Sequence, residues 1–229
     1  MEYPKTENLY ARDEVTHKLR LGEFKRLDFS QVDCWRVTEK IDGTNIRLVL
    51  QAGAFEVRGR TDAASLPPNF EEEALGQAGA DTMAAALAAI DPAGVAITMI
   101  VFGEGYGPGI QKGGGGYAER KSLRIFDVLT YKEGCYSPLW RTWDDVVTVA
   151  TILGLQTVPT LLIGAPTETI VELVRSDLYS QVAARDLDPL IDDLWSLRKM
   201  EGVVARTDPY LYDYRGHRVL WKLKKHDLP

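Results

Sequence analysis

The chain has only two cysteines, Cys34 and Cys135, among its 229 residues. They lack the paired spacing of a zinc site and the density of a disulfide framework. This scarcity favours a reducing compartment, so we predict a cytoplasmic protein. The N-terminal residues lack the apolar stretch of a secretory signal. The longest apolar stretches, around residues 84–90 and 95–102, are too short to cross a bilayer, and we expect no membrane partner.

The sequence also lacks an overall positive charge and the common nucleotide-binding loops. Its net charge is −6, which gives no general attraction for nucleic acid. Residues 198–225 differ, because eight basic side chains less three acidic ones leave +5 there, enough to attract phosphates. There is no Gly-x4-Gly-Lys-Ser/Thr loop, which excludes a P-loop. The run beginning Gly103-x-Gly105 has Pro108 where a dinucleotide-binding loop needs glycine.

Hydrophobic patterning predicts interspersed strands and helices. We expect a hairpin over residues 34–50, because Asp42-Gly43 lies between two alternating apolar runs. A loop is expected over residues 103–116, which are rich in glycine. Irregular alternation favours an α+β fold of mainly antiparallel sheets flanked by helices, in a single domain over residues 1–229. The other expected strands cover residues 55–60, 97–102, 123–129, 158–163, 202–206 and 219–224, and the expected helices cover 13–21, 70–90, 143–153, 167–175 (with Thr167 as N-cap) and 187–197.

Lys40 is the first candidate for chemistry, since it precedes the Asp42-Gly43 turn. A lysine there suits an amine nucleophile attacking phosphorus. The attacking amine must be neutral, whereas the reference pKa of lysine is roughly 10.4, so cations or burial must lower it. Lys222 and Lys224 share one face of the last expected strand, where they can supply such cations and hold phosphate. The alternative is ordinary: a surface lysine beside a turn, and an edge strand protected by lysines.

Four further residues are candidates for a role in the chemistry, although the sequence signal for each one alone is weak. Glu104, between glycines, could reach a ribose hydroxyl or a metal. Glu201 precedes a β-branched strand and could bind a divalent metal. Arg60 lies in an arginine-rich turn that could clamp phosphate. Phe126 could stack on a base, although an aromatic residue within an apolar strand is more often part of the core.

Taken in order, these motifs resemble those of the covalent nucleotidyltransferases. Within that superfamily the chain is most similar to ATP-dependent RNA ligases of the double-strand RNA-repair type. The opening residues 3–9 also look like the start of that group. The resemblance implies a nucleotidyltransferase (ATP-grasp-like ligase) fold. It rests on Lys40-x-Asp42-Gly43-x-Asn45, the turn at Arg60, Phe-Gly-Glu104-Gly, Phe126-Asp127, Glu201-Gly-Val-Val and Lys222-Leu-Lys224.

The resemblance also implies a reaction and a set of roles. Lys40 would attack the α-phosphate of ATP, with Mg²⁺ or Mn²⁺, and carry AMP. The AMP would pass to a 5′-phosphate on RNA, and a 3′-hydroxyl would then expel it and seal the strand. The implied roles are adenine contact for Glu39, orientation or metal bridging for Asp42, later RNA-dependent steps for Asn45, phosphate or ribose contact for Arg60, ribose binding for Glu104, adenine stacking for Phe126 with support from Asp127, metal binding for Glu201, and α-phosphate binding for Lys222 and Lys224.

The sequence departs from the family pattern after Lys224, where only five residues follow. We therefore expect a minimal ligase without the usual C-terminal domain, or a catalytic domain whose grip on RNA comes from a partner protein or domain. A minimal DNA ligase and a GTP-using capping enzyme are alternatives, although Thr44-Asn45 favours the RNA ligases. A further alternative is a self-adenylylating nucleotide-binding module without sealing activity. The complete set of motifs argues against it.

Overall fold

The computed structural model describes residues 1–132, 138–176, 178–187 and 198–228. The chain forms two compact units. Unit 1 contains residues 1–3 and 42–158, and unit 2 contains residues 4–41 and 159–229. The boundary between Ile41 and Asp42 falls inside the motif that begins with Lys40. The single domain over residues 1–229 stays a prediction.

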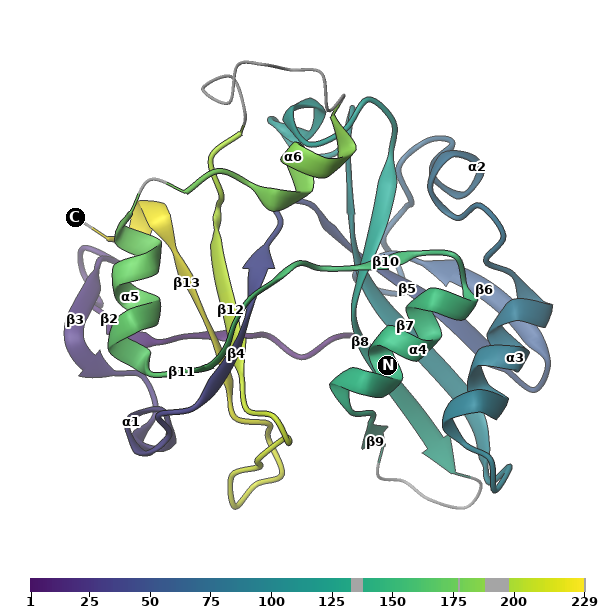
Figure 1. Cartoon of the computed structure of the whole chain (residues 1–229), viewed down its shortest axis with the longest axis horizontal. Coiled ribbons are helices and arrows are strands. Elements are labelled where there is room, and N and C mark those ends of the chain that lie inside the picture. Colours follow the sequence, from purple (N-terminus) through teal and green to yellow (C-terminus); the bar gives the residue numbers. More distant parts are fainter. Residues whose placement is uncertain (133–137, 177, 188–197, 229) are drawn as a thin grey trace. The chain divides into compact units, whose positions relative to one another are not determined.

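Unit 2 is built on a five-stranded sheet of order β1-β13-β12-β4-β11, in which β1 pairs with β13 in parallel and the other pairs are antiparallel (Figure 1). A two-stranded sheet of β2 and β3 belongs to the same unit. The strands are β1 (Glu7–Asn8), β2 (Tyr10–Arg12), β3 (Leu19–Phe24), β4 (Trp35–Lys40), β11 (Thr160–Ala165), β12 (Gly202–Arg206) and β13 (Leu220–Lys224). The helices are α1 (Leu27–Gln31), α5 (Thr167–Arg175), α6 (Gln181–Asp186) and the short 3₁₀-helix η3 (Lys225–Asp227).

Alternation along β4, β12 and β13 gives this sheet one apolar face and one polar face. Trp35 and Trp221 are fully buried on the apolar face, with their rings in edge contact at 5.4 Å. Val203 and Leu223 are also fully buried, and α5 contributes buried residues such as Ile170 to the same core. The opposite face carries the lysines of interest, so core packing fixes the direction in which they point.

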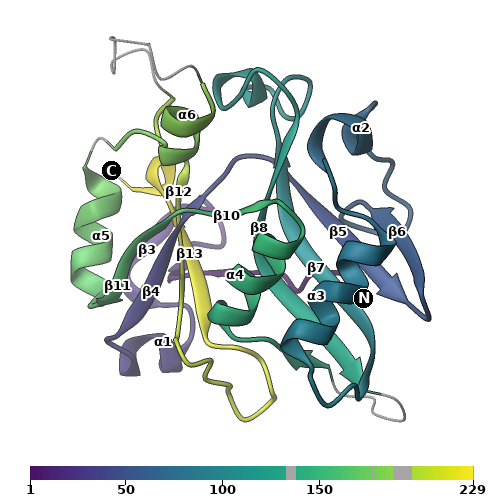
Figure 2. The same cartoon turned by 45° about the vertical axis from the view of Figure 1, so that its right-hand side comes forward.

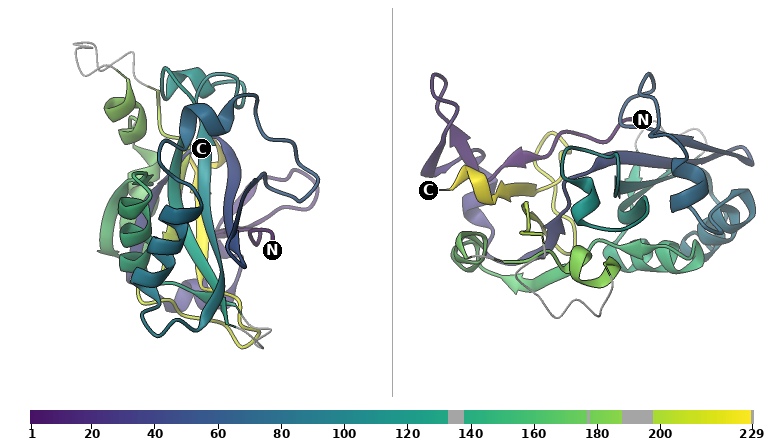
Figure 3. Two further views of the ribbon diagram at one scale, coloured as in Figure 1. Left: turned by 90° about the vertical axis from the view of Figure 1, so that its right-hand side faces the viewer. Right: turned by 90° about the horizontal axis from the view of Figure 1, so that it is seen from above.

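Unit 1 is built on a six-stranded sheet of order β10-β8-β7-β5-β6, with β9 added at β8. Helices α3 and α4 pack against each other on one face of this sheet (Figures 2 and 3). The strands are β5 (Thr44–Gln51), β6 (Ala54–Arg58), β7 (Ala96–Tyr106), β8 (Ser122–Lys132), β9 (Leu139–Trp140) and β10 (Gln156–Thr157). The helices are α2 (Phe70–Ala74), α3 (Ala80–Ile90), α4 (Trp143–Ile152) and the 3₁₀-helix η1 (Gly114–Gly116).

The predicted hairpin over residues 34–50 is wrong. Strand β4 pairs with β11 and β12, whereas β5 pairs with β6 and β7, so the two strands lie in different sheets. An Asp-Gly pair between alternating runs indicates that the chain turns, but it does not determine which strands pair. Each strand pairs where its apolar face becomes buried.

Two predicted helices also differ. Residues 13–21 form a turn followed by β3, because the Asp13 carboxylate accepts hydrogen bonds from the backbone N–H groups of Val15 and Thr16. The helix predicted over residues 70–90 is divided into α2 and α3, between which Gly76 has a φ of +53°. The helix expected over residues 187–197 lies outside the described residues, apart from Leu187.

The remaining elements agree closely with prediction. The expected helix over residues 167–175 is α5, although its N-cap is Pro166 and Thr167 is the first helical residue. Strand β7 runs on to Tyr106, so the first part of the expected glycine-rich loop is strand. The α+β fold with mainly antiparallel sheets is confirmed. Within the described ranges, no helix is long and apolar enough to cross a membrane.

Candidate active site

The site in unit 2 begins with three adjacent strands. Gly202 on β12 pairs with Lys40 on one side and with Lys224 on the other. Directly opposed residues share a face of the sheet, so both lysines project from the polar face. A Cβ atom at position 202 would lie 2.2 Å from the carbonyl oxygen of Leu223. Glycine is therefore needed at this position for the strands to bring the two lysines together.

Glu201 lies between the two lysines and binds both. Its Oε2 atom is 2.5 Å from Lys40 Nζ, and its Oε1 atom is 2.6 Å from Lys224 Nζ. Its side chain is only 11% exposed. Burial alone would raise the pKa of Glu201, but the charges and hydrogen bonds of Lys40 and Lys224 outweigh burial and lower it. Glu201 is thus an ionised carboxylate that neutralises two cations.

Lys222 is the third cation on this face. It lies two residues before Lys224 on β13, and β1 places Asn8 opposite it. Burial lowers the pKa of Lys222, and the positive charges of Lys40, Lys224 and Lys5 lower it further. A cation that is disfavoured in this way gains most when an anion arrives, which is the behaviour expected of a phosphate-binding lysine.

Asn8 is a candidate that the sequence did not single out, beyond the likeness of residues 3–9 to the start of the ligase group. Its side-chain Oδ1 atom is buried and has no hydrogen-bond partner among the described residues. Its register places it beside Lys222, on the lysine face. Buried amide groups nearly always have partners, so the site retains hydrogen-bonding capacity that a ligand can use.

Glu39, the residue before Lys40, points into the opposite face. It is 1% exposed, and its carboxylate accepts hydrogen bonds from the Ser180 hydroxyl and from the backbone N–H groups of Gln181 and Val182. Together with Ser180, it therefore holds the N-terminus of α6 against β4. The adenine contact expected of Glu39 stays a prediction.

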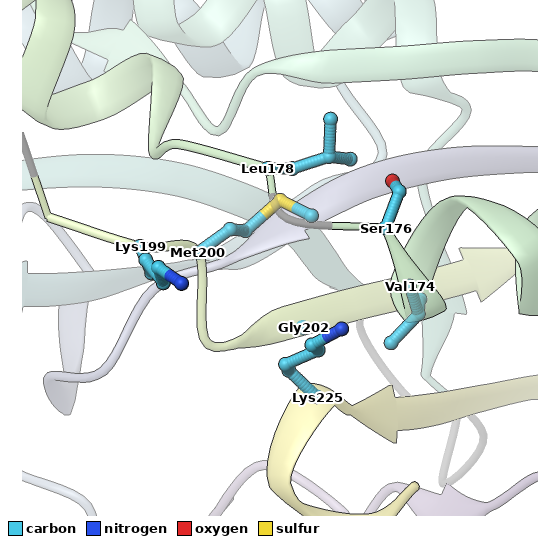
Figure 4. A pocket seen from close by; sticks show the side chains of 7 residues that line it. All are labelled: Val174, Ser176, Leu178, Lys199, Met200, Gly202 and Lys225. Carbon is cyan, nitrogen blue, oxygen red and sulfur yellow. The ribbon is translucent and has the colours of Figure 1, made fainter. Parts of the chain in front are cut away.

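A small pocket lies between the C-terminal end of α5 and the start of β12 (Figure 4). Val174 and Met200 contribute apolar atoms, and Lys199 and Lys225 lie at its edge. Lys225 donates through Nζ to the carbonyl oxygen of Arg175, at the end of α5. The pocket has room for about one water molecule, so it does not hold a nucleotide.

In unit 1, the side chains of Asn45, Glu104 and Arg124 lie on one face of the six-stranded sheet. Asn45 pairs with Glu104, and Glu104 pairs with Arg124 on the next strand. The Oδ1 atom of Asn45 is buried and has no hydrogen-bond partner in the described part of the chain. Arg124 is almost fully buried and donates to the Tyr106 hydroxyl and the Thr157 carbonyl oxygen. Asn45 and Glu104 thus form an adjacent polar pair.

The arginine turn is held by a buried arginine that the sequence did not single out. Arg47 is fully buried, and its guanidinium donates to the carbonyl oxygens of Gly59 at 2.8 Å and Met1 at 3.0 Å. It also lies 2.9 Å from the carboxylate of Asp62. These contacts fix both sides of the exposed Arg60. A basic residue within an apolar strand, five residues after Asp42, was the signal that could have identified it.

The Asp42-Gly43 turn is held by the glycine-rich segment that follows β7. The backbone N–H of Asp42 donates to the Tyr117 hydroxyl at 3.0 Å, and the Gln111 side chain donates to the Gly43 carbonyl oxygen at 3.1 Å. A Cβ atom at position 43 would lie 2.2 Å from the Gly105 carbonyl oxygen, so this contact requires glycine. The glycine-rich segment thus supports the backbone of the motif that follows Lys40.

Phe126 and Asp127 belong to an aromatic cluster. The Tyr3 hydroxyl donates to Asp127 at 2.7 Å, and the Tyr3 ring meets the edges of Phe126 and Trp140. Asp127 is fully buried, whereas Phe126 is partly exposed. Tyr3 thus links Asp127 to the ring of Phe126, and the stacking of Phe126 on adenine stays a prediction.

Comparison with known proteins decides the family. The model of the RNA ligase family matches residues 33–224, which include every candidate residue above except Asn8 and Tyr3. The chain belongs to the RNA ligase family.

Solved RNA ligase structures from Naegleria gruberi share the fold. A variant with ATP and manganese has a TM-score of 0.59 at 16% identity, over 98% of this chain and 56% of that chain. Another variant, without ligand, has a TM-score of 0.58 at 16% identity, over 98% of this chain and 57% of that one. This RNA ligase family member therefore spans little more than half the length of those proteins. No curated protein sequence matches it.

The donor set of this RNA ligase family member suits one kind of metal site. The described residues hold no group of three or more histidine, cysteine, aspartate or glutamate side chains that could bind a metal alone. Glu201 supplies a single ionised carboxylate. Magnesium is commonly bound by one or two carboxylates together with substrate phosphates and water, so Glu201 fits a metal that arrives with a nucleotide.

Proposed function

We propose that the protein is an ATP-dependent RNA ligase that carries AMP on Lys40 and seals a 5′-phosphate to a 3′-hydroxyl end of RNA. The observation that carries the proposal is the arrangement of Lys40, Lys224 and Lys222 on one sheet face, with both oxygens of Glu201 bound to the first two lysines. Membership of the RNA ligase family supports it. Related structures hold ATP or AMP with manganese, which supports ATP as the nucleotide.

The first step needs Lys40 in its neutral form. In the ion pair with Glu201 the amine is an ammonium and has no lone pair. An incoming triphosphate offers Lys224 and Lys222 a new anionic partner, and its negative charge repels the Glu201 carboxylate, which weakens the contact between Glu201 and Lys40. The Lys40 ammonium then gives up its proton to solvent. The amine then attacks the α-phosphorus, a nitrogen–phosphorus bond forms, and the bond to the β-phosphate oxygen breaks with departure of pyrophosphate.

Charge neutralisation by the chain's own residues explains why the lysines gather here. Lys222 and Lys224 would hold the α-phosphate oxygens as negative charge builds up on them. Glu201 would hold Mg²⁺ or Mn²⁺. When bound, the metal would neutralise phosphate charge alongside the lysines.

The residues of unit 1 have proposed roles toward the nucleotide and RNA. Glu104 would bind the ribose, and Phe126 would stack on adenine with Asp127 behind it. Asn45, whose buried Oδ1 atom has no partner among the described residues, would act in the later steps with RNA. Arg60, fixed by its turn, would contact phosphate or ribose. Asp42 would orient the reacting groups, with its backbone held by Tyr117.

The later steps and the biological setting belong to the same proposal. AMP passes from Lys40 to a 5′-phosphate on RNA, and a 3′-hydroxyl then attacks that phosphate and releases AMP. RNA repair, a cytoplasmic location and a partner that adds grip on RNA stay predictions from the sequence.

Two linked assays test the function. The full chain is incubated with magnesium and ATP labelled in the α-phosphate. We expect covalent label that survives denaturing electrophoresis, is absent from Lys40→Arg, and is unchanged in Lys25→Arg, which alters an exposed lysine of the same unit. Absence of label from the unaltered protein would sink the mechanism. Label from GTP in place of ATP would favour a capping-type enzyme.

The second assay adds 5′-phosphorylated RNA or DNA, as single strands and as nicked duplexes. Sealing of RNA is the expected result, and sealing of DNA alone would identify a DNA ligase. Labelled protein that seals none of these substrates would favour the self-adenylylating module instead of the ligase.

A further inference from the structure

The loop between β12 and β13, residues 207–219, exposes a cluster of large side chains. Tyr214 is 87% exposed, Leu211 is 48% exposed and Tyr212 is 47% exposed. All three lie within four consecutive positions. Single exposed apolar residues are ordinary on a protein surface, whereas three large ones on one short loop make that loop a candidate for an interaction site. Figure 1 shows this loop at the lower end of β12 and β13.

The tip of this loop is built around Asp213 and has a defined shape. The Asp213 carboxylate accepts hydrogen bonds from the backbone N–H groups of Arg215 and His217, both at 2.8 Å. The backbone N–H of Asp213 donates to the His217 carbonyl oxygen, and Gly216 supplies the required positive φ of +78°. Arg26, from the start of α1, lies 3.2 Å from the Asp213 carboxylate. Tyr214 is therefore presented by a structured turn, which lowers the entropy lost on binding.

The chemistry at the tip suits unpaired bases. The guanidinium of Arg215 lies over the Tyr214 ring, 5.1 Å from its centroid. Both acidic side chains of the loop have basic partners, because Asp208 pairs with Arg36 and Asp213 pairs with Arg26. Their negative charge is thus neutralised, while the tip offers an aromatic face and a guanidinium. Proteins bind single-stranded nucleic acid with aromatic side chains that stack on bases and arginines that meet phosphates.

The position of the loop in unit 2 favours nucleic acid over a protein partner. The loop connects the strand that follows Glu201 to the strand that carries Lys222 and Lys224. Lys222 follows Tyr214 by eight residues, so even a fully extended chain would separate the two by at most roughly 29 Å. A strand of a few nucleotides covers this distance, so RNA with one end at the lysines can reach the tip.

We propose that Tyr214 and Arg215 form a binding site for single-stranded RNA, on which an unpaired base of the substrate stacks. The site would bind RNA near the end that is being joined, and it would raise affinity without taking part in the reaction of Lys40. This inference rests on the proposed ligase function for the identity of the substrate.

The test measures RNA affinity and self-adenylylation separately in the full chain. The probe is a fluorescent, 5′-phosphorylated single-stranded RNA, with a blunt RNA duplex for comparison, both followed by anisotropy. We expect Tyr214→Ala to weaken single-strand binding about 5- to 150-fold, the usual contribution of one stacked base. Tyr214→Phe keeps the ring and should stay within about twofold. Because Tyr214 is highly exposed, neither change should disturb folding, and both variants should label with ATP normally.

The salt dependence of RNA affinity tests the role of Arg215 independently. Arg215→Gln should reduce the slope of log affinity against log salt by about one if its guanidinium meets one phosphate. Arg20→Gln, an exposed arginine of β3 in the same unit, is the matched control and should leave the slope unchanged.

Several results would overturn the inference. An unchanged single-strand affinity in Tyr214→Ala would leave the loop to a protein partner. An equal loss of affinity in Tyr214→Phe would exclude stacking. An equal loss of affinity for the duplex would exclude a preference for unpaired bases. A protein that binds no RNA also overturns it. Failure of the ligase function is distinguishable, because it would show as absence of ATP-derived label on the protein. The RNA titration would still measure whether the loop binds single-stranded RNA.

Discussion

Removal of the charge on Glu201 is the most informative perturbation of this protein. Glu201→Gln keeps the shape of the side chain and leaves the ammonium groups of Lys40 and Lys224 without their shared counter-ion. The two contacts are 2.5 and 2.6 Å long, and at an effective dielectric constant of about 20 each is worth roughly 6 kcal/mol before desolvation is counted.

The net effect is much smaller than this Coulomb energy. Desolvation cancels most of it, and loss of one partner from a fully buried pair costs about 3–5 kcal/mol. The lysine side chains are 21% and 27% exposed, so water screens them in part. We therefore expect Glu201→Gln to lower the free energy of unfolding at neutral pH by about 2 kcal/mol. That corresponds to a fall of roughly 4–8 °C in unfolding temperature.

The pH dependence of this loss has a definite sign. Because the pKa of Glu201 is lower in the folded protein than in the unfolded chain, its charge stabilises the fold above the unfolded pKa. That stabilisation disappears as the pH falls through the lowered folded pKa. The difference between the unaltered protein and Glu201→Gln should therefore be full at neutral pH and should shrink at acidic pH.

Thermal unfolding, followed by circular dichroism across this pH range, provides the assay. Glu23→Gln is the matched control, since Glu23 pairs with Arg20 at 3.4 Å on the exposed surface of the same unit, where a pair contributes at most about 1 kcal/mol. Equal stability of Glu201→Gln and the unaltered protein at neutral pH would refute the reasoning. A difference that persists unchanged into acid would refute it as well.

Three other predictions concern single side chains. Arg47→Met should lower the free energy of unfolding by about 2–4 kcal/mol in denaturant titrations, because it leaves buried acceptors without donors. The control Arg58→Met, at a partly exposed position, should change it by less than about 1 kcal/mol. Tyr117→Phe should cost about 1 kcal/mol and slow the labelling of Lys40, since it removes the hydrogen-bond acceptor of the Asp42 backbone. Binding of pyrophosphate at alkaline pH should be accompanied by proton uptake, because a bound anion reverses the lowering of the Lys222 pKa. Titration calorimetry in buffers of different ionisation enthalpy would measure the proton uptake, which Lys222→Met should abolish.

Local sequence signals were reliable where the local pattern and the burial of a face agreed. The helix over residues 167–175 and the strand over residues 202–206 were predicted at their observed bounds. The hairpin at Asp42-Gly43 failed because the choice of pairing partner is not local. Residues 13–21 failed because one aspartate, Asp13, can bind backbone N–H groups and favour a turn over a helix.

The sequence by itself determined the chemical residues of this protein, their order and hence the RNA ligase family, because those residues lie in short motifs that can be read one at a time. Only the tertiary structure showed that Glu201 joins Lys40 to Lys224, that Glu39 faces the core, and that Arg47 holds the arginine turn. These contacts link residues far apart in the chain, or depend on which face a strand buries. Strand pairing and burial decide both, and no single motif contains that information.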